Sequence, residues 1–240
     1  MMTLSYKYYE RLMQRKIVEG EKFTNVRGGW YSIVAVVDDD HALVKHGDKH
    51  GHVSLEKNKD IKLGCVKNPY HPKIFGVGYM GVNKEDPFAK NSKTREYSIW
   101  YSMLARCYNR ELQIKTPSYI GCTVADEWHD FQKFSQWYRS QEFNDCGYDM
   151  DKDLLSKEKK VYSPETCCLI PKDLNTSLVG ITENTDDALF VLKNVHRYQK
   201  VADLTEHYRG SVSDATSKAL DSFLADVKNT LNAQAIGDKK

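Results

Sequence analysis

The stretch YDMDKDLLSKEKKVYSPETCCLIPKDLN, residues 148–175, decides the fold of this 240-residue chain. Its first part, YDMDKDLL, alternates apolar and acidic residues and so predicts a strand. The next part, SKEKKVYSPET, is charged and contains a Ser-Pro pair, which predicts a turn-rich crossing. CCLIP predicts a second strand, and KDLNTSL predicts the start of a helix. The order is strand, loop, strand, helix, which is a ββα unit.

The charge of the whole chain is almost balanced. Its 35 Lys and Arg residues face 33 Asp and Glu residues, a formal net charge of +2, so any phosphate-binding surface has to be local. Hydrophobic residues make up 40% of the chain, which is enough for real cores. The sequence contains no apolar run near the ~20 residues that span a bilayer and no signal-peptide core. We therefore expect a cytoplasmic location and no membrane partner.

Three segments precede the central region. Residues 1–18 are predicted to form an N-terminal helix. Residues 19–66 contain four β-rich runs separated by turn residues, which predicts a small β-barrel-like unit, with an open antiparallel meander as the alternative. Residues 67–96 predict a linker with tight turns. Gly76, Gly78 and Gly81 read G-x-G-x-x-G there, but they lack the strand-turn-helix context of a dinucleotide site.

The central region, residues 97–180, is predicted to contain two helices before the ββα unit. Each has apolar residues at helical spacing, namely Trp100, Met103, Leu104 and Cys107 in the first and Trp128, Phe131, Phe134 and Trp137 in the second. Aromatic residues at this spacing indicate a core more often than a platform for stacked bases. We expect His129, beside them, to be a solvated or hydrogen-bonded surface residue.

Residues 181–240 are predicted to form helices. Thr185 is the expected N-cap of a helix that runs to about Tyr208 and is closed by Gly210, and Ser213 is the expected cap of a second helix. Both helices are amphipathic, so they are expected to pack against the body of the protein or a partner. The chain as a whole is therefore predicted to be an α+β protein with a helical C-terminal tail.

The six cysteines show no C-x-x-C pair and no regular spacing. Most of them lie in apolar or aromatic stretches, so they are predicted to be buried free thiols. No zinc site is expected.

Residues 97–175 contain three signatures, Y-x-x-W-x-x-M-L-x-R-C-Y, C-x-V-x-x-x-W-x-x-F-x-x-F and D-K-D…Y-S-P-E-T-C. With these signatures the segment resembles a family of phage-encoded HNH homing-endonuclease-like proteins. The resemblance implies a site for Mg²⁺ or Mn²⁺ held by Asp151 and Asn175. It places Lys152 where the family has a histidine general base, and Thr166 where an asparagine usually fixes the loop. Because an ordinary Lys is protonated at neutral pH, cleavage is expected to be weak or absent.

The C-terminal region resembles the helix and tail of an Apetala-type DNA-binding domain, in which a three-stranded sheet packs on one helix. Only about nine residues separate Asn175 from Thr185, so the three strands do not fit. The sheet that would enter the major groove is therefore expected to be missing, and with it most sequence specificity.

These resemblances imply a phage DNA-binding accessory protein in an infected bacterial cell, with a role in replication, transcription or anti-defence. The residues expected to hold DNA phosphates are basic, namely Lys93, Arg95, Arg106, Arg110, Lys157, Lys159 and Lys160, with solvated surface charges as the alternative. The catalytic candidates are Asp151, Lys152 and Asn175. The alternatives are an active metal-dependent DNA endonuclease, a module whose C-terminal helices dock a phage or host protein, and a degenerate scaffold.

Overall fold

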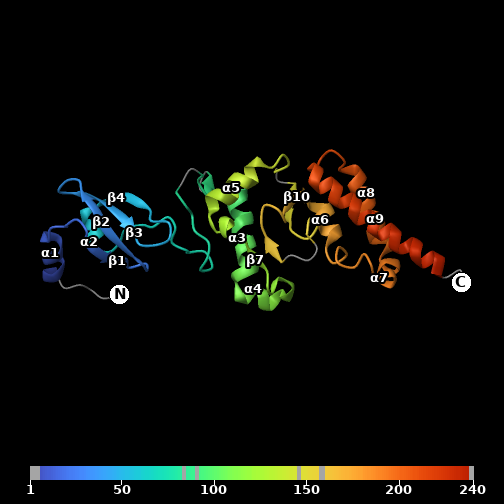
Figure 1. Ribbon diagram of the computed structural model, residues 1–240, viewed down its shortest axis with the longest axis horizontal. Coiled ribbons are helices and arrows are strands. Elements are labelled where there is room, and N and C mark those ends of the chain that lie inside the picture. The colour runs from blue at the N-terminus through green and yellow to red at the C-terminus, as the bar shows by residue number, and fades with distance from the viewer. Residues whose placement is uncertain (1–5, 83–84, 90–91, 145–146, 157–159, 238–240) are drawn as a thin grey trace. The chain divides into compact units, whose positions relative to one another are not determined.

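The computed structural model describes residues 6–82, 85–89, 92–144, 147–156 and 160–237 (Figure 1). The chain divides into two compact units, Met1–His71 and Pro72–Lys240. Both contain helices and short strands, so the α+β class is confirmed. None of the helices in these ranges has the length and apolarity needed to cross a membrane.

The first unit is a four-stranded antiparallel sheet with two helices. The chain order is α1 (Tyr6–Gln14), β1 (Lys22–Thr24), β2 (Trp30–Val36), β3 (His41–His46), β4 (Val53–Lys57) and α2 (Asn58–Lys62). The strands pair in the order β1-β2-β3-β4. Tyr31, Ile33 and Val44 form the core of this unit with Ile61 of α2, and each is at most 2% exposed.

The predicted barrel is not formed, and the meander that was its alternative is observed. In the described residues β1 and β4 remain the two edges of the sheet. The segment after β4 was expected to supply another strand, but it forms the short helix α2. Asn58 begins this helix by donating its backbone N–H to the Asp40 carbonyl at 2.7 Å and its side-chain amide to the Asp39 carbonyl at 2.9 Å. Ile61 therefore fills the core from a helix, and the sheet stays open.

The second unit begins at Pro72, inside the predicted linker. Its first elements are β5 (Phe88–Ala89), β6 (Ser92–Lys93), α3 (Arg95–Tyr108), α4 (Arg110–Lys115), the 3₁₀ turns η1 (Pro117–Tyr119) and η2 (Asp126–His129), β7 (Thr123–Val124) and α5 (Phe131–Ser140). Tyr79 is tied to the start of α5, because its N–H donates to the His129 carbonyl and its carbonyl accepts from Phe131. The residues just after Pro72 are thus part of the folded unit.

Two glycines allow this segment to lie close to the helices. A Cβ at Gly78 would come within 2.5 Å of Leu104 on α3. Gly81 has a φ of +68°, and a Cβ there would come within 2.4 Å of the Asp130 carboxylate. That carboxylate caps α5 by accepting the N–H of Gln132 at 2.9 Å. The glycines therefore serve close packing against α3 and α5.

The aromatic positions of the second unit form its first core, as predicted. Trp100, Trp128, Phe131 and Phe134 are at most 1% exposed, and the Trp100 indole N–H donates to the Trp128 carbonyl at 2.7 Å. His129 is hydrogen-bonded, as expected, since its Nε2 lies 3.4 Å from the Tyr108 hydroxyl. These rings are core residues and not a surface for bases.

The ββα unit has the predicted order. It consists of β8 (Tyr148–Asp151), a crossing that contains β9 (Val161–Tyr162), β10 (Cys168–Pro171) and α6 (Lys172–Leu178). β8 and β10 are antiparallel with Asp151 opposite Cys168, while β9 pairs in parallel with β7. The first strand is shorter than predicted, because Asp151 starts a turn by accepting the backbone N–H groups of Asp153 and Leu154.

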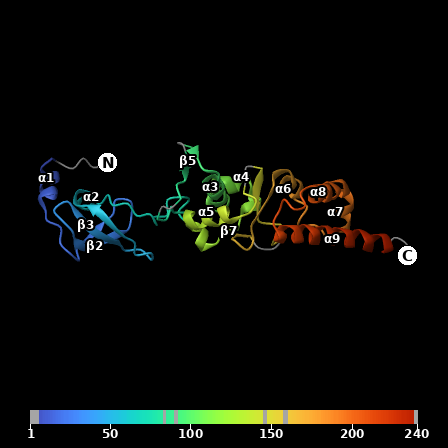
Figure 2. The ribbon, with the colours of Figure 1, turned by 90° about the horizontal axis from the view of Figure 1, so that it is seen from above.

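The C-terminal helices are α7 (Ala188–Lys193), α8 (Val195–His207) and α9 (Asp214–Gly237), and α9 runs along α7 and α8 (Figure 2). The prediction of one helix capped by Thr185 is wrong. Asp187 is the cap, since its carboxylate accepts from Phe190, and Asn194 interrupts the helix because its side chain donates to the Phe190 carbonyl. The apolar faces of α6, α8 and α9 meet in a second core that includes Leu174, Tyr198, Val201, Leu220 and Phe223.

Candidate functional site

A hollow of about 420 Å³ lies where α3, the end of β8 and α6 come together. Segments that are about 50 residues and about 20 residues apart in sequence contribute to it, so it depends on the tertiary fold. The lining residues are Arg95, Ser98, Ile99, Ser102, Arg106, Tyr119, Asp149, Met150, Asp151, Lys152, Asp153, Tyr162, Asn175 and Val179. All three catalytic candidates and two of the predicted phosphate-binding residues are among them.

Asp151 stands at the end of β8, where the chain turns. Its Oδ1 accepts the N–H of Asp153 at 2.9 Å and that of Leu154 at 2.7 Å. Burial raises the pKa of this carboxyl above its usual range, and these backbone hydrogen bonds counteract part of the rise. Asp151 is therefore held in one orientation by its own turn.

Lys152 follows directly, and its side chain is only 12% exposed. The ammonium group forms an ion pair with Asp153 and lies 5.8 Å from the centre of the Tyr162 ring. Burial alone would lower the pKa of Lys152, but the hydrogen bond and charge of Asp153 raise it above its ordinary value. Lys152 is consequently a cation at neutral pH and has no free pair of electrons with which to accept a proton.

Asn175 comes from α6, which packs on β8 and β10 through the buried side chains of Leu174 and Leu178. This packing brings Asn175 to the same hollow as Asp151. The local sequence pattern predicted the helix, whereas the packing of α6 on the two strands places the Asn175 amide in the hollow.

Arg106 reaches the hollow from the last turn of α3. Its guanidinium carbon lies 5.4 Å from the centre of the Tyr119 ring. Burial alone would lower the pKa of Arg106, but the neighbouring Tyr162 and Tyr119 raise it above its ordinary value, and Tyr162 does so partly through a side-chain hydrogen bond. In the ranges that the structure describes, no carboxylate forms an ion pair with this guanidinium, although it feels the charge of Asp149.

Arg95 also lines the hollow, but its guanidinium is bound within the protein. Its Nε donates to the Tyr138 hydroxyl at 3.1 Å, another nitrogen donates to the Tyr148 carbonyl, and Asp149 lies 3.7 Å away. Arg95 therefore ties β8 to α5 and has little capacity left for a ligand.

Of the remaining predicted phosphate-binding residues, the three that the structure describes do not line this hollow. Lys93 lies over the rings of Tyr97 and Tyr101, Arg110 is exposed at the start of α4, and Lys160 donates to the Ile120 carbonyl at 3.3 Å. Lys157 and Lys159 lie outside the described residues. Among the described residues predicted to bind phosphate, Arg95 and Arg106 line the hollow, and Lys152 is a third cation there.

Thr166, which stands where the resemblance expects an asparagine, is hydrogen-bonded within its own loop. Its hydroxyl donates to the Val161 carbonyl at 2.6 Å and accepts the N–H of Ser163 at 3.0 Å. The Thr166 hydroxyl therefore ties residues 161–166 together. Sequence reasoning missed Tyr119 and Tyr162, and only Tyr162 had a signal, its place within the Y-S-P-E-T-C signature.

The divalent ion that the resemblance implies does not fit this set of donors. Oδ1 of Asp151 already accepts two N–H groups, and the charged Lys152 stands next in the chain with its ammonium fixed in the same hollow. A cation in that position repels Mg²⁺ or Mn²⁺ and neutralises the acids that would attract it. Among the described residues, no three His, Cys, Asp or Glu side chains are arranged to hold a metal.

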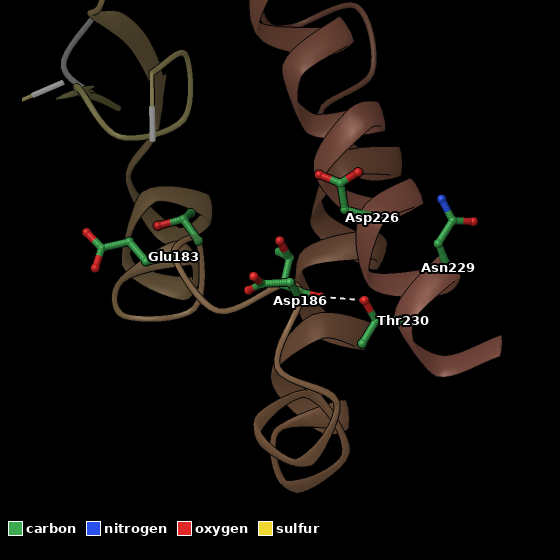
Figure 3. A pocket seen from close by; sticks show the side chains of 7 residues that line it. Glu183, Asp186, Asp226, Asn229 and Thr230 are labelled. Atoms are coloured by element: carbon green, nitrogen blue, oxygen red, sulfur yellow. Dashed lines mark hydrogen bonds between the residues drawn. The ribbon is translucent and has the colours of Figure 1, made fainter. Parts of the chain in front are cut away.

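A second hollow, of about 490 Å³, lies between the loop before α7 and α9 (Figure 3). Its lining contains Glu183, Asp186 and Asp226, and no basic residue. The Thr230 hydroxyl donates to the Thr185 carbonyl at 2.7 Å, which fastens α9 to that loop. Because its charge is negative, this hollow is unsuited to a phosphate.

No family model, curated protein or solved structure matches this chain. The expected membership of the homing-endonuclease family and the expected remnant of an Apetala-type domain therefore remain predictions. What the protein does has to be inferred from the chemistry of the first hollow.

Proposed function

We propose that this chain is a DNA-binding protein that holds a backbone phosphate in the hollow between α3, β8 and α6, with little sequence preference and little or no cleavage. The observation that carries the proposal is Arg106, a guanidinium without a carboxylate partner in the described part of the chain. Guanidinium groups donate two parallel hydrogen bonds to phosphate oxygens, so one whose charge is not balanced by a carboxylate favours an anionic ligand in its hollow.

The other charges of the hollow support the same ligand. Three cations and three carboxylates line it, but Asp149 is paired with Arg95 and Asp153 with Lys152. Asp151 accepts the backbone N–H groups of Asp153 and Leu154. Arg106 is thus the cation whose charge is least compensated, and the hydroxyl of Tyr162 beside it stays protonated because burial raises its pKa.

Weak sequence preference follows from what the described residues lack. The aromatic rings at helical spacing, among them Trp100, Trp128 and Phe131, are in the core and offer no stacking surface to bases. The described residues between Asn175 and the start of α7 contain the end of α6 and turns, and no strand, which agrees with the expected deletion of the base-reading sheet. Phosphate contacts alone carry no sequence information.

Weak cleavage follows from Lys152, which stands where the resemblance requires a general base. A protonated amine cannot take a proton from water, and losing general-base assistance typically costs ~10²- to 10⁴-fold in rate. A phage protein of this kind would serve replication, transcription or defence against the host by occupying DNA.

The test is fluorescence anisotropy with labelled single- and double-stranded 20-mers of unrelated sequence over a range of KCl concentrations. Arg106→Gln should weaken binding ~10-fold for every sequence and reduce the slope of log K against log salt by ~1, since one phosphate contact is lost. Arg110→Gln is the matched control, because Arg110 is exposed and outside the hollow. The affinity of Arg110→Gln for DNA should stay within twofold of the native value, because removing one exposed charge changes the binding free energy by only roughly 0–1 kcal/mol.

Three outcomes would contradict the proposal. Equal losses for the two variants would place the binding surface elsewhere. Robust Mg²⁺-dependent cutting by the native chain that is lost in Asp151→Ala would establish the endonuclease alternative. Absence of DNA binding would favour the docking module, for which the exposed Leu189, Leu192 and Val195 would then be the surface to test.

A further inference from the structure

We propose that the ammonium group of Lys152 takes the place of a divalent ion in the hollow, so that the protein holds DNA phosphate without a metal. This inference rests on the proposed DNA binding and specifies how the site achieves it. It predicts that Asn175 meets the phosphate as an amide donor instead of a metal ligand.

The first argument is that the Lys152 ammonium is fixed in position. Surface lysines are usually mobile, but this side chain is only 12% exposed, and its end is held between the carboxylate of Asp153 and the ring of Tyr162. An ammonium has three N–H donors, and the ion pair with Asp153 leaves others for a ligand. A fixed cation with free donors performs the charge-neutralising role of a bound metal at a phosphate.

The second argument is that Asp151 is committed to the protein. Both of its hydrogen bonds to described residues fall on Oδ1, where they close the turn after β8. An ion binding Asp151 would also have to approach the charged side chain of its chain neighbour. The same hollow presents Arg106, whose forked donors complete a cationic pair with Lys152.

Two measurements on the full-length chain test the inference. The first is binding of Mn²⁺ itself, followed by water-proton relaxation, to the native protein and to Asp151→Asn. No Mn²⁺ site that depends on Asp151 should be found up to ~1 mM, a range that covers ordinary carboxylate sites. Binding by the native protein that Asp151→Asn removes would overturn the inference.

The second measurement is DNA affinity in EDTA, compared with affinity in MgCl₂ at matched ionic strength. The native protein should bind at least as well in EDTA. Lys152→Met keeps an apolar side chain beside Tyr162 and removes the charge. It should weaken DNA binding ~10-fold in EDTA, which is the loss expected when one charge-assisted hydrogen bond is removed. Lys152→Arg should keep most of the affinity, which shows that charge and not mere folding is responsible.

The two proposals fail separately. DNA binding that requires Mg²⁺, or that is unchanged in Lys152→Met, would overturn the role of Lys152 and leave DNA binding standing. Absence of DNA binding under all conditions would overturn the proposed function and with it this role.

Discussion

The ring of His46 lies inside the core of the first unit, where it is 3% exposed, and its Nε2 has no hydrogen-bond partner among the described residues. Burial lowers the pKa of His46, and the nearby His52 lowers it further, while Asp48, Glu56 and the backbone of Lys67 act in the opposite direction. The folded first unit therefore holds this imidazole in its neutral form.

Acidification should consequently destabilise the first unit. Because the folded pKa lies below the unfolded value near 6.5, the unfolded chain binds more protons, and stability falls as pH drops from about 6.5 toward the folded pKa. Hydrogen exchange of the β2 and β3 amides at pH 7.5 and 5.5 should show this loss, and His46→Gln should reduce the difference. His41→Gln is the control, since His41 lies at the surface beside Asp38. An equal effect of both substitutions would refute the assignment.

At the scale of elements, the contact between residues 72–82 and the start of α5 can be tested with two glycines. Both Gly76 and Gly81 have positive φ, but only a Cβ at Gly81 meets another residue, the Asp130 carboxylate. Gly76→Ala should cost ~1 kcal/mol for its backbone conformation alone. Gly81→Ala should cost clearly more, ~2–4 kcal/mol, because it also displaces the cap of α5. Urea unfolding measures both, and equal costs would show that the segment is not docked on α5.

Local pattern predicted those elements whose signals are local. The alternation in YDMD and the apolar spacing of Trp100, Met103 and Leu104 identify a strand and a helix, since each records which face is buried. Local pattern fails at residues 58–62 and at Asn194, because side-chain hydrogen bonds to the backbone determine the structure there. The Asn58 amide donates to the Asp39 carbonyl, and the Asn194 amide donates to the Phe190 carbonyl. Such bonds are not visible in a hydrophobic pattern.

Some residues of the hollow could be predicted from local sequence and others depend on tertiary packing. The acidic turn at Asp151 and the helical Asn175 could be predicted, because they lie in one continuous stretch. The basic residues that line the hollow with them could not be predicted, because their positions depend on how α3 packs against the strands. Lys93 and Arg106 look alike in the sequence, yet Lys93 lies over the rings of Tyr97 and Tyr101 and Arg106 lines the hollow.

At the scale of the whole molecule, every described residue that lines the hollow belongs to the second unit. A chain of residues 72–240 should therefore bind DNA with an affinity within about threefold of the full protein, a difference of at most about 0.7 kcal/mol. Anisotropy titration checks this, with Arg106→Gln in the shorter chain as the specificity control. If the shorter chain is folded and does not bind, the first unit contributes phosphate contacts.

The cysteines give the protein built-in reporters of its own opening. Cys107, Cys122 and Cys167 lie in the first core of the second unit and Cys168 in the second core, whereas Cys65 of the first unit is exposed. Burial raises the pKa of Cys107 and of Cys167 to about 12, so these thiols are unreactive while the core is closed. The rate at which each buried thiol is alkylated, followed by mass spectrometry, therefore reports how often its part of the second unit unfolds locally. DNA bound in the hollow beside these cores should slow the alkylation of the buried thiols, because it stabilises the folded state. The native cysteines are sufficient to observe this effect.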